Sequence, residues 1–136
     1  MILVDLNVLL DVVQKREPHY RASAAVLEAI IKGDVEGAFP AHGTTTVHYI
    51  VARYQDRAVA DKAVDWLLRY FRIAPVRREE LLRARALGWG DFEDAVVAAA
   101  AESIGCTAIV TRNIGDFADS PVEALTPEEF LLRNGT

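Results

Sequence analysis

Short apolar runs alternate along the chain with longer segments whose apolar residues recur at helical spacing. Residues 1–5 and 107–111 contain continuous apolar stretches, which are typical of strands covered on both faces of a sheet. Residues 96–104 are apolar nearly all the way round, and a helix without a polar face is normally buried. Gly105 follows as a residue that ends a helix. The pattern therefore predicts a core built from these strands and this helix.

The rest of the pattern predicts an alternation of helices and strands. Further helices are expected over 6–14, 18–32, 44–54, 56–71, 78–87 and from 126 onward. Further strands are expected over 36–40, 72–76 and 120–125, and Pro75 limits the strand beside it to a short or edge position. In the last helix Thr126 is expected to be the N-cap, with Pro127 in the first turn. The alternation predicts the α/β class, a three-layer α/β/α sandwich with a mainly parallel central sheet.

The composition is that of one globular domain. A chain of 136 residues, 51% of them hydrophobic, is expected to form a single domain over residues 1–136 with a proper core. Cys106, the single cysteine, lies at an apolar strand and is expected to be a buried, unreactive thiol in a reducing compartment. We see no secretory leader, and no apolar run approaches the ~20 residues of a membrane span. We therefore expect a cytoplasmic protein without membrane contact.

Acidic and amide side chains gather at the ends of the buried elements. Asp5 directly follows the first strand, and Asn113 and Asp116 follow the strand predicted just before them. The carboxyl ends of parallel strands meet at one edge of a sheet, where ligand sites are found. Asp91 and Asp94 are three residues apart at the start of the buried helix, so their carboxylates share one face. We expect all five side chains to meet at one cleft.

A cluster of carboxylates points to a bound cation. Several carboxylates at one cleft repel each other unless a cation holds them. Oxygen ligands without a cysteine or histidine cluster suit a hard ion, Mg²⁺ or Mn²⁺. The formal net charge of −5 argues at first against a nucleic-acid partner. Setting aside the four clustered aspartates leaves −5 + 4 = −1, however, so a site filled with divalent metal would remove most of this imbalance.

In this order, the motifs resemble those of the PIN-domain nucleases. The similarity rests on MILVDLNVLLD, DFEDAVVAAAA and TRNIGDF, and it runs through the whole chain to the closing LTPEEFL. The resemblance implies a parallel sheet flanked by helices, a metal-dependent active site and hydrolysis of RNA phosphodiester bonds. Many small members of the family resemble VapC-type toxins, which are ribonucleases restrained by a cognate antitoxin. Such members commonly form homodimers, so the resemblance also implies an antitoxin partner and a second copy.

The resemblance assigns roles to the clustered side chains. Asp5 and Asp94 would be the core metal ligands, and Asp116 a third ligand, directly or through water. Asp91 would hold a second ion or orient a water, unless it serves only as the N-cap of the helix. Asp116 has the alternative of being only a turn residue. Asn113 would fix a ligand or contact phosphate.

One segment departs from the family pattern. PIN-domain nucleases usually place a glutamate early in the helix after the second strand, whereas this chain has no carboxylate there and Thr46 or His48 takes the equivalent place. Thr46 would hydrogen-bond a ligand carboxylate. His48 would bind metal or phosphate, or be satisfied by a neighbouring side chain. Arg112 would pair with phosphate or form a salt bridge at the rim, and Asp11 is expected to be a solvated helix residue.

Two other functions stay open at this point. The missing glutamate favours a binding module for RNA or protein that keeps the fold without catalysis. The aspartate after the first strand also permits a phosphohydrolase of small phosphate esters, but Asn7 stands where such enzymes place a second aspartate.

Overall fold

A parallel sheet of five strands forms the centre of the computed structural model, which describes residues 1–135. The strands are β1 (Ile2–Val4), β2 (Gly37–Pro40), β3 (Arg72–Ala74), β4 (Ala108–Val110) and β5 (Ala124–Leu125), in the spatial order β3-β2-β1-β4-β5. Every neighbouring pair is parallel. The chain thus starts in the middle of the sheet and builds outward to both edges.

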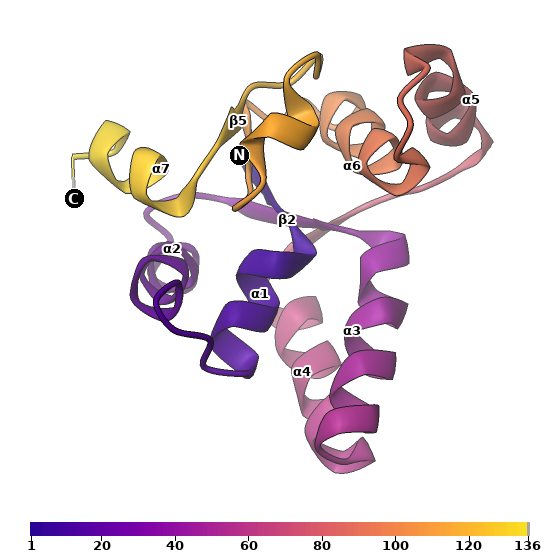
Figure 1. Cartoon of the computed structure of the whole chain (residues 1–136). Helices are drawn as coiled ribbons and strands as arrows, with labels where there is room; N and C mark the ends of the chain where they lie inside the picture. The colour runs from indigo at the N-terminus through magenta and orange to yellow at the C-terminus, as the bar shows by residue number, and fades with distance from the viewer. Residues whose placement is uncertain (136) are drawn as a thin grey trace.

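Helices connect the strands and cover both faces of the sheet (Figure 1). They are α1 (Leu6–Val13), α2 (Tyr20–Lys32), α3 (Ala41–Tyr54), α4 (Arg57–Tyr70), α5 (Arg78–Leu87), α6 (Phe92–Ser103) and α7 (Pro127–Arg133), with a 3₁₀ turn η1 (Ile114–Phe117).

The alternation of side chains along β1 divides the core into two parts. Ile2 and Val4 face a cluster formed with α1, α2, α3, α4 and α7, whereas Leu3 faces a cluster formed with α6. Helix α5 packs on the outer side of α6, away from the sheet (Figure 1). The three-layer α/β arrangement predicted from the sequence is confirmed.

Most helices and strands begin and end close to the residues predicted from the sequence. Gly33 has a left-handed φ of 82° at the end of α2, and Thr126 caps α7 with Pro127 in its first turn. β3 lies at an edge, as Pro75 predicted. Cys106 is buried, and burial raises the pKa of its thiol to about 11, so it is the unreactive residue expected.

Helix α3 begins at Ala41, three residues before the predicted start, and its first turn contains Gly43. A Cβ at Gly43 would lie 2.9 Å from the Phe39 ring, so only glycine fits there without displacing the ring. Two smaller differences are that α2 begins at Tyr20 rather than at Pro18, and that η1 was not predicted.

Within residues 1–135, no helix is long and apolar enough to cross a membrane.

Candidate active site

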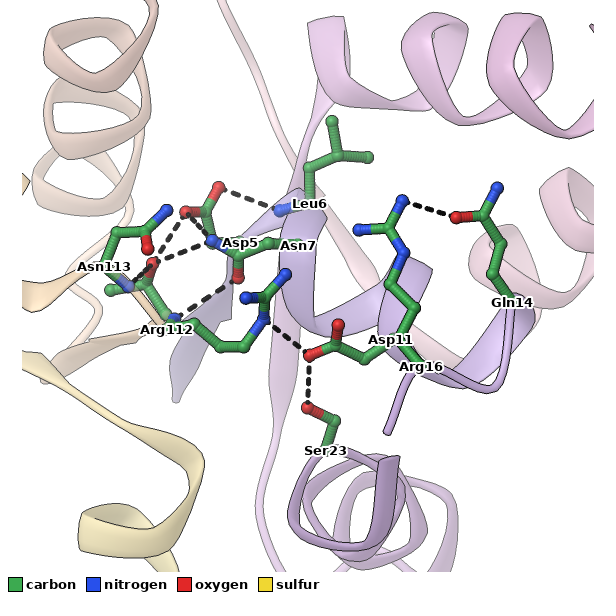
Figure 2. Close-up of polar contacts among 10 residues, drawn as sticks. Asp5, Leu6, Asn7, Asp11, Gln14, Arg16, Ser23, Arg112 and Asn113 are labelled. Carbon is green, nitrogen blue, oxygen red and sulfur yellow. Dashed lines mark hydrogen bonds and ion pairs between the residues drawn. The ribbon is translucent and has the colours of Figure 1, made fainter. Parts of the chain in front are cut away.

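Asp5 lies where β1 passes into α1, at the carboxyl edge of the sheet. It is the N-cap of α1, and one carboxylate oxygen accepts a hydrogen bond of 2.8 Å from the Leu6 N–H (Figure 2). The other oxygen accepts one of 2.8 Å from the Thr111 hydroxyl, and the side chain is buried with 7% exposure. A buried carboxylate requires such partners.

Asn7 and Thr111 form a polar network around Asp5 that the sequence analysis did not identify (Figure 2). The Asn7 amide donates to Asp5 at 3.4 Å and to the Thr111 hydroxyl at 3.3 Å. The Asn113 N–H also donates to that hydroxyl, at 3.1 Å. Thr111 follows β4 as Asp5 follows β1, and Val4 pairs with Val110 in the sheet. The sequence could therefore have predicted that Thr111 lies beside Asp5, provided that β1 and β4 were assumed to be neighbouring strands.

Asp91 and Asp94 stand at the start of α6. The Asp91 side chain accepts a hydrogen bond of 3.0 Å from the Asp94 N–H and is the N-cap of the helix. The capping role considered from the sequence is therefore confirmed, and it leaves the second Asp91 carboxylate oxygen available. Asp94 is partly buried and projects from the first turn of α6.

Electrostatic coupling brings the separated aspartates together. The pKa of Asp94 is raised to about 7, chiefly by burial and then by the negative charges of Asp91, Asp5 and Asp116. The pKa of Asp5 is also raised, first by burial, while its hydrogen bond from Thr111 acts in the opposite direction. Asp116 adds to the rise in both groups. Carboxylates from β1, α6 and η1 therefore share one electrostatic environment.

An open cleft of about 360 Å³ is lined by three of the five predicted side chains, Asp91, Asp94 and Asp116, whereas Asp5 and Asn113 are not part of its lining. Its lining includes Asp91 and Asp94 from the α6 end, and Asp116 and Asp119 from the segment after β4. Trp89 also lines it and packs edge-on against Phe117 with ring centroids 5.9 Å apart. The cleft is thus strongly acidic, with an aromatic side chain fixed at its wall.

Helix α3 reaches the acidic cluster through a residue that the sequence analysis missed. His42 lies in the first turn of α3, and its Nε2 is 3.8 Å from a carboxylate oxygen of Glu93. Burial lowers the pKa of His42, whereas the pKa of Glu93 is raised by burial and by Asp5 and Asp91.

The two α3 residues predicted for this region lie further along the helix. His48 Nε2 is 2.8 Å from an Asp61 carboxylate oxygen on α4, so the predicted alternative of a neighbouring partner is confirmed. Thr46 is partly buried on α3. A metal or phosphate role for His48 and Thr46 remains a prediction.

The prediction that Asp11 is a solvated helix residue is wrong. Asp11 is fully buried rather than solvated, and its Oδ2 is 2.8 Å from Arg112 Nε and 3.0 Å from the Ser23 hydroxyl (Figure 2). The Arg112 Nε–H does not point at the Asp11 oxygen, so this contact is an ion pair rather than a directed hydrogen bond. Arg112 forms a salt bridge, as one of its alternatives predicted, but with the buried Asp11 rather than at the rim; a phosphate contact remains a prediction.

The donor set at the cleft matches a hard divalent cation in kind and charge. Asp5, Asp94 and Asp116 offer carboxylate oxygens, and their mutual repulsion is what a cation would relieve. Over residues 1–135, no three acidic, histidine or cysteine side chains already stand close enough to hold a metal ion. A cation bound here would therefore require these side chains to rotate toward it.

Comparison with known proteins gives the family. The PIN domain profile matches residues 1–115, so this chain belongs to the PIN domain family. Ribonuclease VapC1 of Aquifex aeolicus (strain VF5) is 26% identical over 140 residues, which span 99% of this chain and 96% of that protein.

Solved structures share the fold. A toxin–antitoxin complex from Klebsiella pneumoniae contains a chain with a TM-score of 0.72 and 24% identity, covering 93% of this chain and 98% of that one. VapBC2 from Rickettsia felis, bound to a DNA fragment from its promoter, contains a chain with a TM-score of 0.71 and 18% identity, with the same coverage.

Proposed function

We propose that this PIN-domain protein is a divalent-metal-dependent endoribonuclease, a hydrolase, that acts as the toxin of a type II toxin–antitoxin pair. The observation that carries the proposal is the gathering of Asp91, Asp5 and Asp116 around the partly buried Asp94, whose pKa is raised to about 7 by burial first and then by these negative charges. A purely structural site would not gather unneutralised carboxylates in an open cleft. The family and the similarity to a ribonuclease support RNA as the substrate.

Some of the clustered residues would bind the metal, and others would position those ligands or the substrate. Asp5, Asp94 and Asp116 would hold Mg²⁺ or Mn²⁺, and Asp91 would bind a second ion or orient a water while it caps α6. A bound divalent ion supplies a Lewis acid and an acidified water for phosphodiester hydrolysis. Thr111 and Asn7 fix the Asp5 carboxylate, so one ligand is already oriented. Asn113, on the exposed loop beside it, would contact the phosphate or a ligand.

The proposal includes partners and location. The solved structures of similar fold are described as toxin–antitoxin complexes, which supports a cognate antitoxin as partner. A homodimer in the cytoplasm is the assembly that we propose for this chain.

RNA cleavage by highly purified protein tests the proposal. We expect cleavage of a mixed-sequence RNA that depends on Mg²⁺ or Mn²⁺ and is abolished by EDTA. Asp5→Asn and Asp94→Asn should each lower the rate by at least about 100-fold, since both remove a ligand charge. Asp65→Asn on α4, an exposed carboxylate outside the cleft, is the control. Equal cleavage by all four proteins would contradict the proposal.

A second candidate is a PIN-fold binding module with weak or no catalysis. Two observations favour it. Helix α3 brings His42 rather than a carboxylate close to Glu93 at the start of α6, and no three acidic, histidine or cysteine side chains among residues 1–135 form a ready-made metal group. It predicts RNA or protein binding without cleavage and no stabilisation by Mn²⁺. Metal-dependent turnover that is lost in Asp94→Asn would exclude it.

A further inference from the structure

The buried ion pair between Asp11 and Arg112 is a feature that metal binding does not explain. Asp11 lies on α1 with no exposed surface, and Arg112 lies in the segment that follows β4 with a side chain 24% exposed. Ser23 of α2 donates a hydrogen bond to the same Asp11 oxygen. Burying two charges costs free energy that can exceed what their attraction returns, so the pair is weak evidence for a stabilising role and leaves room for a positioning one.

The ion pair sits at one end of a network that leads to the cleft (Figure 2). The Arg112 N–H donates to Asn7 Oδ1 at 3.3 Å, and the Asn7 amide contacts Asp5. On the other side, Asn113 is tied to Thr111 at 3.1 Å, and the Asp116 N–H donates to the Asn113 carbonyl at 3.0 Å. Arg112 is therefore anchored to α1 twice, by its side chain at Asp11 and by its backbone N–H at Asn7, and the loop that carries Asp116 follows directly after it.

We infer that Asp11 and Arg112 are positioning residues, which clamp the segment from Arg112 to Asp116 onto α1 so that Asp116 faces Asp5 and Asp94. This inference rests on the proposed function for its catalytic consequence. Asn113, Ile114, Gly115 and Asp116 are exposed, so this segment is held mainly at its two ends, by Arg112 on one side and by the buried Phe117 on the other. Without the clamp, Asp116 would sample positions outside the cleft, and a misplacement of about 1 Å is enough to cost ~100-fold in rate.

A double variant removes the clamp without leaving a buried charge. Asp11→Leu combined with Arg112→Met replaces the pair by apolar side chains of similar size, which buried pairs tolerate. We expect a melting temperature close to that of the parent, a kcat lower by about 10–100-fold and a KM within about twofold. The matched control replaces the exposed pair of Glu123 and Arg133, whose charged atoms are 2.6 Å apart, with glutamine and methionine. Its kcat should equal that of the parent.

Asp11→Asn separates positioning from direct phosphate binding by Arg112. If Arg112 contacts the substrate, loss of the Asp11 charge frees it, and KM falls while kcat is kept. Positioning predicts the opposite, a lower kcat with an unchanged KM. A fall in KM, or a double variant with the kcat of the control, would overturn the inference.

Amide hydrogen exchange supplies a readout that does not depend on cleavage. We expect exchange at residues 112–117 to rise by about tenfold in Asp11→Asn, while β1 and β4 keep the protection of the parent. A parent that fails to cleave RNA would refute the proposed function, yet the exchange result would still decide whether Asp11 holds this segment. Unchanged exchange at residues 112–117 in Asp11→Asn would overturn the inference that Asp11 holds this segment.

Discussion

Replacing Asp94 with asparagine should stabilise the metal-free protein. The substitution keeps the shape of the side chain and removes a charge that burial and neighbouring carboxylates disfavour. A pKa raised from 3.8 to about 7 corresponds to about 4 kcal/mol at full strength. Solvent reaches this partly exposed side chain, so screening reduces the expected gain to about 1–2 kcal/mol. The α6 macrodipole favours a carboxylate in the first turn by only ~0.3–1 kcal/mol, which does not reverse the sign.

The gain should depend on pH in a defined way. Because the folded-state pKa of Asp94 is raised, the parent loses stability as pH rises from about 4, where the unfolded chain ionises, through about 7. Asp94→Asn lacks this loss, so the two proteins should differ little at pH 4 and most at pH 8. The expected difference in melting temperature at pH 8 is about 3–8 °C in favour of the variant.

Thermal unfolding in EDTA at several pH values measures this difference. Asp65→Asn, an exposed carboxylate in α4, is the matched control and should follow the parent at every pH. High salt should shrink the difference, since it screens partly exposed charges. A variant that is no more stable than the parent at pH 8, or a difference independent of pH, would refute the claim that the aspartates are coupled.

Three further substitutions test separate parts of the structure. Thr111→Val should lower the free energy of unfolding by about 1–3 kcal/mol and reduce RNA cleavage, because the buried Asp5 carboxylate loses a donor at 2.8 Å. Denaturant unfolding measures the first effect and an RNA cleavage assay the second. Gly37→Ala should cost about 1–3 kcal/mol, because the added Cβ would lie 2.6 Å from the Ile30 Cδ1; wild-type stability would show that this contact relaxes freely. Asp91→Ser should keep the helix cap and stability within ~0.5 kcal/mol, yet lower cleavage by about tenfold; full activity would leave this residue a cap only.

The sequence predicted the parts of the site that depend on strand order and short spacings. Asp5 was identified because it follows a continuously apolar strand, and Asp94 because it opens a helix with no polar face. Those patterns report burial directly, and parallel strands then bring their carboxyl ends together. The alternation of strands and helices predicted the three-layer fold, and Pro75 predicted the edge position of β3.

The errors lie where packing overrides local preference. The helix after β2 was expected from residue 44, but α3 begins at Ala41 with Gly43 against the Phe39 ring. As a result, His42 rather than Thr46 or His48 approaches Glu93. Asp11 was assigned to solvent because aspartate is rarely fully buried without a partner. Its partner, Arg112, lies far along the chain, and no local pattern links the two.

Binding of Mn²⁺ to the metal-free protein, followed by electron paramagnetic resonance, tests the shared acidic site most directly. The parent should remove Mn²⁺ from solution in a saturable manner, and Asp94→Asn should bind it about 10–100-fold more weakly. Equal binding of Mn²⁺ by both proteins, or none by the parent, would contradict a cation site built from Asp5, Asp94 and Asp116.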